Sequence, residues 1–250
     1  MRTLFTVLGS VLLLASAGMV HAVDADEVMV LSDSPLRPAL TRIAESFQRR
    51  TGHTVTFVFG LSPVIEKKVL DGEAADVVLV QPEFVDELVK AGKVTHEDHP
   101  VVARVGIGLF TRANATIPDI STVPALKHTL LDADTLVLSN VATGNYFVTV
   151  LERLGVADAV TGKVIRASPA DVVLRIVQGT SRDIAVGTIT LILEDTRLKL
   201  IGPLPDELQK PLVYAAAITT NARAVDPARE FIQFLGSGGA RAAMRAVGAE

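Results

Sequence analysis

The chain contains no cysteine and no tryptophan, and only 4% of its 250 residues are aromatic. The absence of cysteine excludes disulfide bonds, thiol nucleophiles and cysteine-ligated metals, so the stability of the fold has to come from apolar cores. The shortage of aromatic rings argues against a sugar-binding site that relies on ring stacking. The function classes that remain need neither thiols nor aromatic platforms.

Positive charge is also in short supply. The chain carries 24 Lys and Arg residues against 28 Asp and Glu residues, a formal net charge of −4, which becomes −5 if Arg2 is removed with a leader. An acidic protein is poorly suited to bind nucleic acid or an anionic membrane, and we expect neither as a partner. A small anion is not excluded, because it responds to local dipoles more than to net charge.

Long apolar runs are missing except at the N-terminus. Leu4–Val20 is apolar and uncharged, follows Arg2, and ends in the small-x-small sequence Val20-His21-Ala22. This order is typical of a secretory signal peptide, so we predict that residues 1–22 are cleaved and that the mature chain begins at Val23. The alternative is an uncleaved membrane anchor. Cleavage implies export, and we expect a periplasmic protein.

Catalytic motifs are missing as well. The sequence has no G-x-S-x-G or S-x-x-K nucleophile motif and no glycine-rich phosphate loop. Histidine is sparse, and the segment His96-Glu97-Asp98-His99 lacks the helical i, i+4 spacing of a metal site, so we interpret it as a solvated loop. We therefore predict no enzyme, no catalytic residue, no cofactor and no residue that binds a metal cation.

What is present is a regular alternation of strand and helix patterns. In the first half, strands are predicted at residues 28–31, 55–59 and 75–80, and helices at 35–50, 63–71 and 82–91. Gly52 and Gly92 follow two of these helices, as glycine commonly does at helix C-termini. The order strand-helix-strand-helix-strand predicts a right-handed unit on a parallel sheet.

A long strand pattern at residues 101–110 predicts a crossing into a second domain. Further strands are predicted at 135–138, 164–165, 184–187, 198–201 and 214–220, and helices at 169–178, 227–235, 239–247 and in a segment that ends at Leu154. No flexible linker separates these elements from those predicted in the first half of the chain. We therefore predict an α/β fold of two domains with mainly parallel sheets. Domain 1 comprises 23–104 plus 217–250, domain 2 comprises 105–216, and a two-strand hinge near Val105 and Ala217 joins them.

Two predicted strands run directly into a Ser-Pro pair that opens a helix, at Ser34-Pro35 and at Ser62-Pro63. Serine suits the N-cap position, and proline suits the first helical position because its missing N–H is unpaired there anyway. A helix N-terminus offers free N–H donors and partial positive charge, which favours anions. Thr143-Gly144 and Ser168-Pro169 repeat the arrangement later in the chain.

These residues also have a plain interpretation, in which each serine only caps its helix. In open α/β sheets, however, ligands bind at the carboxyl ends of the strands, and two facing domains direct their helix N-termini into one cleft. A cleft with neutral donors suits an anion that is held by hydrogen bonds. We therefore predict a binding site for a small anion.

Over residues 28–247 the chain resembles the periplasmic molybdate-binding proteins of ABC importers. The resemblance is carried by the Phe-basic-x-x-Gly helix end at Phe47–Gly52, by the serine turn Phe59–Pro63, and by Val69–Val77, which resembles an I-x-x-G-A-P-A-D segment. It implies the type II periplasmic binding protein fold and an ABC permease in the inner membrane as the partner. We also expect a monomer.

The resemblance further implies a tetrahedral oxyanion ligand, such as molybdate or tungstate, held by serine hydroxyls, backbone amides and a tyrosine hydroxyl. The implied ligand-binding residues are Ser34 and Ser62 for the hydroxyls, Thr143 and Val172 for the amides, and Thr190 at the tyrosine position. Thr190 is a departure from the family pattern, because a threonine hydroxyl reaches less far than that of a tyrosine.

Asp33, beside the first serine, is a second departure. A desolvated carboxylate that faces a dianion is unfavourable, so Asp33 has to point away, be protonated, or indicate another ligand. The main prediction is a solute-binding protein that captures an oxyanion for an ABC importer. The alternatives are a small organic anion such as a carboxylate in the same fold, a sensor or accessory protein without an importer, and an enzyme.

Overall fold

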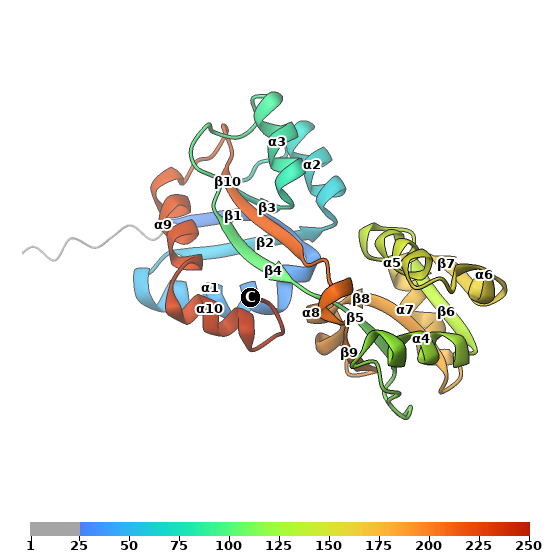
Figure 1. Cartoon of the computed structure of the whole chain (residues 1–250). Coiled ribbons are helices and arrows are strands. Elements are labelled where there is room, and N and C mark those ends of the chain that lie inside the picture. The colour runs from blue at the N-terminus through green and yellow to red at the C-terminus, as the bar shows by residue number, and fades with distance from the viewer. Residues whose placement is uncertain (1–25) are drawn as a thin grey trace, which may run out of the picture.

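The computed structural model describes residues 26–250, so the predicted signal peptide lies outside the described residues. The chain forms two five-stranded sheets, which lie in two separate halves of the molecule (Figure 1). The first sheet contains β1 (Glu27–Asp33), β2 (Thr54–Gly60), β3 (Val77–Val80), β4 (Val101–Val105) and β10 (Leu212–Ile218). The second contains β5 (Ile107–Arg112), β6 (Thr135–Ser139), β7 (Val164–Ala167), β8 (Asp183–Thr188) and β9 (Leu198–Pro203).

The two sheets have equivalent strand orders, β2-β1-β3-β10-β4 and β7-β6-β8-β5-β9. In each sheet the first three strands are parallel, and the fourth is antiparallel to both of its neighbours. Four of the five strands therefore share one direction, which confirms the predicted α/β fold with mainly parallel sheets. The register of β1 and β2 sets Asp33 beside Gly60 at the carboxyl ends of both strands.

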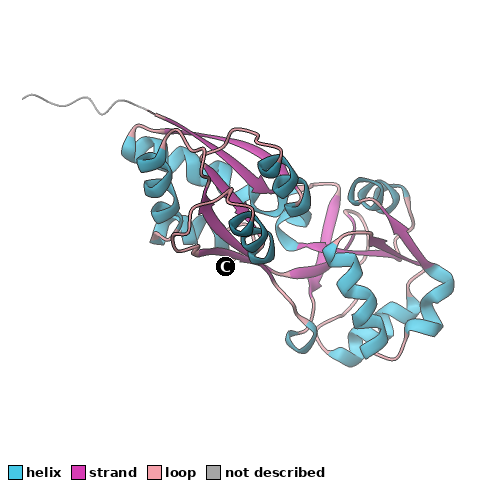
Figure 2. Ribbon diagram, turned by 90° about the horizontal axis from the view of Figure 1, so that it is seen from above, coloured by secondary structure: helices cyan, strands magenta, loops and turns pink. Residues whose placement is uncertain are grey.

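Helices cover both faces of the first sheet (Figure 2). The apolar sides of α1 (Arg37–Thr51), α9 (Val225–Leu235) and α10 (Gly238–Arg245) pack on one face, and α2 (Ser62–Leu70) and α3 (Pro82–Lys90) pack on the other. The short 3-10 turn η1 (Ser34–Leu36) connects β1 to α1. Because both faces are covered, β1 has to be apolar on both sides, and Val28, Val30 and Leu31 are fully buried.

The second sheet is covered in the same way. One face packs against α4 (Val123–Asp132), α5 (Ala142–Arg153) and α6 (Ala157–Val160), and the other against α7 (Pro169–Gln178) and α8 (Ile189–Glu194). The sequence patterns did not predict α4, α6 or α8. None of the helices within residues 26–250 combines the length and the apolarity that a membrane crossing requires.

The two sheets are connected at two crossings. The predicted strand at 101–110 is divided by Gly106, so that β4 pairs in the first sheet and β5 in the second. The return runs from the end of β9 through the turn η3 (Asp206–Leu208) into β10. All of β10 pairs in the first sheet, so residue 217, where the second crossing was expected, lies inside that strand.

A side-chain amide links the two crossings. Gln209, after η3, donates from Nε2 to the carbonyl oxygen of Ile107 at 2.9 Å and accepts at Oε1 from the N–H of Ile107, also at 2.9 Å. This is the pair of hydrogen bonds that a neighbouring backbone strand would make. One glutamine therefore takes the place of a strand at the beginning of β5.

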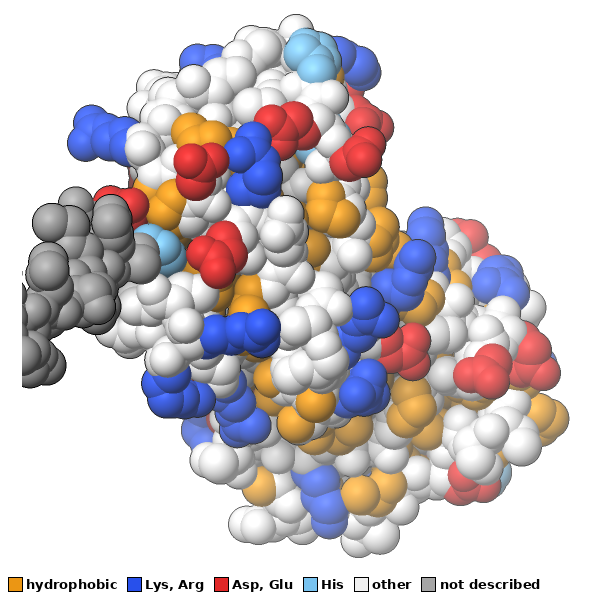
Figure 3. Space-filling model, turned by 90° about the vertical axis from the view of Figure 1, so that its left-hand side faces the viewer, with side chains coloured by type: hydrophobic (Ala, Val, Ile, Leu, Met, Phe, Trp, Pro, Cys, Tyr) orange, Lys and Arg blue, Asp and Glu red, His pale blue; other side chains and the backbone are white. Residues whose placement is uncertain are grey.

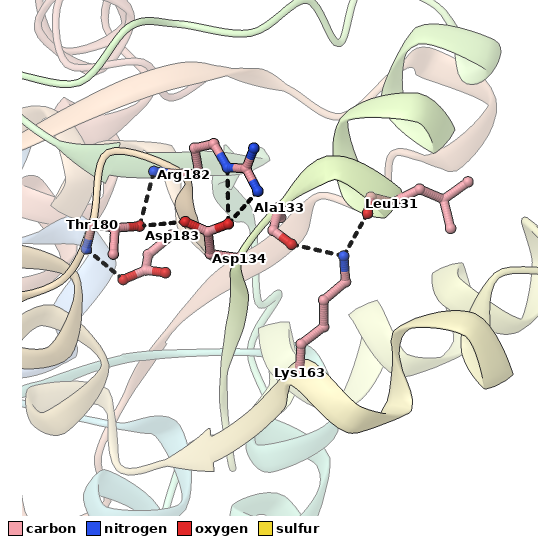
Figure 4. A network of polar contacts seen from close by, with 7 residues as sticks. All are labelled: Leu131, Ala133, Asp134, Lys163, Thr180, Arg182 and Asp183. Carbon is pink, nitrogen blue, oxygen red and sulfur yellow. Dashed lines mark hydrogen bonds and ion pairs between the residues drawn. The ribbon is translucent and has the colours of Figure 1, made fainter.

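The amino ends of β6 and β8 carry a polar network of their own (Figure 4). Asp134 forms an ion pair with Arg182 and accepts from the hydroxyl of Thr180 at 3.0 Å. Lys163 donates to the carbonyl oxygens of Leu131 and Ala133 at 2.6 and 2.7 Å, which satisfies free carbonyls at the end of α4. Asp134, Arg182 and Lys163 thus each have partners within the protein.

Candidate functional site

The carboxyl ends of strands from both sheets border one cleft between the two domains, with a volume of about 1230 Å³. Parallel strands of an α/β sheet end at the same edge, which brings residues distant in sequence together there. From the first domain the lining includes Asp33, Ser34, Ser62, Gln81, Glu83 and Tyr214. From the second it includes Ser139, Asn140, Ala142, Thr143, Ala170 and Val172.

Ser34 and Ser62 line the cleft, but neither is the N-cap that the sequence predicted. Asp33 and Leu61 occupy the N-cap positions, and neither makes a side-chain cap bond. The Ser34 hydroxyl instead donates to the carbonyl oxygen of Gly60 at 3.0 Å, and the Ser62 hydroxyl donates to the Asp33 carboxylate. The cap prediction is wrong at both positions because each helix begins one residue earlier than expected, so that each serine is its first residue rather than its N-cap. Both hydroxyl protons are therefore engaged within the protein.

Asp33 is the last residue of β1 and is only 3% exposed. Its Oδ2 accepts from the backbone N–H of Ser62 at 3.1 Å and from the Ser62 hydroxyl. Its Oδ1 is buried and has no hydrogen-bond partner among residues 26–250. Burial raises the pKa of the Asp33 carboxyl from 3.8 to about 6, because desolvation outweighs the opposing effects of the nearby donors of Ser62, Ser34 and Gln81. A carboxyl group that titrates near neutral pH is thus part of the cleft.

Tyr214, on β10, is a cleft residue that the sequence did not indicate. Its side chain is fully buried, and its hydroxyl has no partner within the described part of the chain. Burial, with further contributions from the charges of Asp33 and Glu83, raises the Tyr214 pKa above its usual value. The phenol therefore stays protonated and is a potential hydrogen-bond donor to a ligand. The available signal was a single tyrosine in an otherwise aliphatic strand, Leu212–Ile218.

The opposite wall begins with Thr143, in the first turn of α5. This helix starts at Ala142 with Val141 at the N-cap, so Thr143 lies inside it. The Thr143 hydroxyl is 3.2 Å from Ser139 Oγ, which also accepts from the N–H of Gly144. The backbone N–H groups of Ala142 and Thr143 make no hydrogen bond within residues 26–250. These free donors make the N-terminus of α5 suitable for an anion.

Val172 and Thr190 are placed differently from Thr143. The N–H of Val172 is not free, because it donates to the carbonyl oxygen of Ser168 at 2.9 Å. Two residues earlier in α7, the N–H of Ala170 has no partner within residues 26–250. Ser168 caps α7 as predicted, accepting from the N–H of Asp171 at 3.3 Å. Thr190 lies in α8, is 1% exposed and is not part of the cleft lining. The structure thus brings four of the five predicted site residues to the cleft, namely Ser34, Ser62, Thr143 and Val172.

Cationic side chains of the lining are paired with carboxylates. Arg37 of the first domain makes two bonds, at 2.7 and 3.2 Å, to Glu194 of the second, and Arg197 pairs with Asp195. Over the face seen in Figure 3, basic and acidic side chains are interspersed. Across residues 26–250, no group of three or more His, Asp or Glu side chains could hold a metal ion. An anion in the cleft would be bound mainly by N–H and O–H groups.

Comparison with known proteins gives relatives over almost the whole chain. An aconitate isomerase from a Pseudomonas species is 27% identical over 232 residues, covering 90% of this chain and 88% of that protein. The molybdate-binding protein ModA of Haemophilus influenzae is 23% identical over 243 residues, covering 94% of each chain. The two relatives are named after different small molecules, aconitate and molybdate.

A solved structure gives the same architecture. The periplasmic molybdate-binding protein of Azotobacter vinelandii superposes with a TM-score of 0.73 at 20% identity, covering 89% of this chain and 98% of that one. Residues 28–250 match the family described as bacterial extracellular solute-binding protein. The chain therefore belongs to the bacterial extracellular solute-binding protein family.

Proposed function

We propose that this protein captures a small organic anion of the carboxylate class in the cleft between its domains. We further propose that it does so in the periplasm, as a monomer, and passes the ligand to an ABC permease. The observation that carries the choice of ligand is Asp33, a buried carboxyl group in the cleft that accepts a hydrogen bond from the Ser62 hydroxyl. Of the ligand classes that the sequence leaves open, Asp33 therefore favours the small organic anion over the oxyanion.

The buried carboxyl group of Asp33 restricts which ligands the cleft can hold. An oxyanion such as molybdate is small and offers only acceptor oxygens, so both of its negative charges would lie near an ionised Asp33, whereas a longer organic acid can keep its carboxylates at the opposite wall. An organic acid with a hydroxyl or a protonated carboxyl group can donate to the free Oδ1 of Asp33. Its ionised carboxylate can accept from the free N–H groups of Ala142, Thr143 and Ala170 on the opposite wall.

An oxyanion is the second candidate, because the same free N–H groups would suit it. The likeness to molybdate-binding proteins in sequence and in fold supports this candidate. It requires a protonated Asp33, which becomes a donor below pH about 6. The name of the Pseudomonas relative, in turn, adds an unsaturated tricarboxylic acid to the ligands that need testing.

The proposal is tested by thermal unfolding at pH 7.5 with aconitate, citrate, simple dicarboxylates, molybdate, tungstate and sulfate. A ligand at 100 times its dissociation constant adds about 2.7 kcal/mol to the unfolding free energy. For a protein of this size that raises Tm by roughly 5–10 °C. We expect shifts with organic acids only. A shift with molybdate and tungstate alone would refute the proposal and establish the second candidate.

A matched pair of variants tests the contribution of the α5 N-terminus. Ala142→Pro removes a free N–H, and proline is tolerated at the first helical position. Gly238→Pro makes the same change at the first position of α10, away from the cleft. We expect Ala142→Pro to weaken ligand binding about tenfold or more, as for a lost bond to a charged group, with Gly238→Pro unchanged. Equal affinities would exclude this N–H from the site.

A further inference from the structure

Two polar atoms in the first-domain wall of the cleft are buried without a partner inside the protein. They are Oδ1 of Asp33 and the hydroxyl oxygen of Tyr214, and neither has a hydrogen-bond partner among the described residues. The residues are only 3% and 0% exposed. One is an acceptor and the other a donor. Buried polar groups are nearly always paired, so an unpaired acceptor and donor in one cleft indicate a ligand that meets both.

We propose that Asp33 and Tyr214, with Ser62 as a positioning residue, form a proton-transfer site that shifts the double bond of an unsaturated carboxylic acid. This inference rests on the proposed function, because the site can act only on a carboxylate bound in the cleft. It adds a chemical step to the binding proposed above.

Asp33 is placed to act as the general base. Ser62 holds Oδ2 through two hydrogen bonds, which fixes the carboxyl group and leaves Oδ1 without a partner in a residue that lines the cleft. A base works best when its pKa is close to the working pH, and burial raises that of Asp33 to about 6. An Asp base of modestly raised pKa combined with a tyrosine donor is a known solution for carbon–hydrogen proton transfer.

Tyr214 supplies the second requirement, a donor at the oxygen where negative charge develops. Its pKa is raised above the usual value, so the phenol keeps its proton and does not compete with Asp33 as a base. A buried hydroxyl that is already in position stabilises an enolate without reorganising solvent. The free N–H groups of Ala142 and Thr143 face the same cleft and can hold a second carboxylate of the substrate.

The reaction balances without a cofactor. Oδ1 of ionised Asp33 takes a proton from an allylic carbon, and the electron pair of that C–H bond enters the conjugated system. The resulting dienolate carries its charge on a carboxylate oxygen that accepts the Tyr214 O–H. The proton on Asp33 exchanges with solvent, and Asp33 then delivers a proton to the far carbon of the allyl unit, so the double bond moves by one position. Substrate and product are isomers, and Asp33 ends ionised as it began.

The test is proton NMR of the purified protein with cis-aconitate and with trans-aconitate in D₂O. We expect interconversion of the two isomers together with loss of their carbon-bound proton signals as deuterium enters. The rate should rise with pH and reach half its maximum near pH 6, as Asp33 ionises. Binding of each acid is measured in parallel by calorimetry.

Asp33→Asn and Tyr214→Phe are the informative variants, since each keeps the shape of its side chain. We expect each to slow exchange by about 100-fold or more, while calorimetry still detects the acid. The matched control is Asp183→Asn, a buried carboxyl group at the opposite end of the second sheet, whose exchange rate should equal that of the wild type (Figure 4).

The outcomes separate the two proposals. Binding of an unsaturated acid by the wild type without exchange above the protein-free rate would overturn the proton-transfer site and leave the proposed function standing. Failure to bind any organic acid would overturn both. Exchange that persists in Asp33→Asn would remove Asp33 as the base. If Asp33→Asn fails to fold, then Tyr214→Phe and the pH profile decide the question.

Discussion

The two walls of the cleft come from domains of the same architecture but carry opposite chemistry. β1 and β6 hold equivalent places, each lying between two parallel neighbours. β1 ends in a buried carboxyl group, Asp33, whereas β6 ends in Ser139 and is followed by the exposed amide Asn140. One wall therefore presents a proton acceptor, and the other presents backbone donors.

The difference shows which part of a site the architecture determines. Strand order brings the strand ends and helix N-termini to one cleft, because all of them lie at the carboxyl edge of their sheets. It does not determine which groups are found there. A symmetric pair of donor walls would suit an oxyanion, whereas one acceptor wall facing one donor wall suits a ligand that both donates and accepts. Changes made at matching places in the two walls separate these cases.

The largest expected effect comes from adding one methyl group to one glycine of each domain, at Gly144 in α5 and at Gly60 at the end of β2. A Cβ at Gly144 would overlap the backbone oxygen and nitrogen of Ser139, which cannot move aside. A Cβ at Gly60 would meet the end of the Ile65 side chain at 3.2 Å, which can move. We expect Gly144→Ala to cost about 3 kcal/mol or more and Gly60→Ala below about 1 kcal/mol, measured by urea unfolding. Similar costs at the two glycines would contradict the close packing of Gly144 against the backbone of Ser139.

The next effect is a pH dependence of stability that only the first-domain wall of the cleft, which contains Asp33, should cause. The pKa of Asp33 is higher in the folded state, about 6 against 3.8, so its contribution to stability is complete below pH 4 and lost as pH rises past 6. Two units correspond to about 3 kcal/mol. As the pH rises from 4 to 7, the unfolding free energy of Asp33→Asn should therefore increase by about 3 kcal/mol relative to that of the wild type. Urea unfolding measures this difference.

The matched control for this pH dependence lies on the other wall. Asn140→Asp places a carboxyl group after β6, where the side chain is exposed and its charge stays hydrated. We expect no added change in stability between pH 4 and pH 7. If the unfolding free energy of Asn140→Asp fell with pH as much as Asp33 makes that of the wild type fall, the two strand ends would not differ in burial as described.

The smallest effect concerns the one ion pair described here that joins the two walls, Arg37 with Glu194. Both side chains are more than a third exposed, at 45% and 36%, so Arg37→Ala should cost below about 1 kcal/mol and less at high salt. Arg182→Ala removes a pair inside the second domain and serves as the control. We expect only Arg37→Ala to change the small-angle scattering profile, because only this pair bridges the domains. Identical profiles would show that the pair does not hold the walls together.

Much of the fold was predictable from the sequence, because its signals are local. The helix expected at 35–50 is α1 at Arg37–Thr51, and the strand expected at 55–59 is β2 at Thr54–Gly60. Their apolar spacing and their glycine and proline boundaries lie within the segments themselves. The helix α4 was missed although Thr122 caps it, because its apolar residues form no clear stripe in the sequence.

The site was predicted only in part, because its decisive contacts are distant in sequence. The cap expected at Ser62 depended on the nearest N–H groups, but its hydroxyl partner is Asp33, 29 positions away. Thr190 could not be assigned a direction because α8 had not been predicted. Tyr214 reaches the cleft only because β10 returns to the first sheet beside β3. Asp33 itself was noticed as a departure, and its burial explains why it matters.

The glutamine at the crossing has a consequence for how fast the domains can move. The amide of Gln209 holds the start of β5 through two hydrogen bonds that a turn of one side chain can release. Rotamer changes of this kind take picoseconds to nanoseconds, whereas collective domain motions take microseconds to milliseconds. Release of this contact is therefore not the slow step in domain movement. Backbone bonds between β4 and β10, and from the N–H of Leu204 to Ile107, tie the two crossings permanently, and the Gln209 amide adds a contact that can be released.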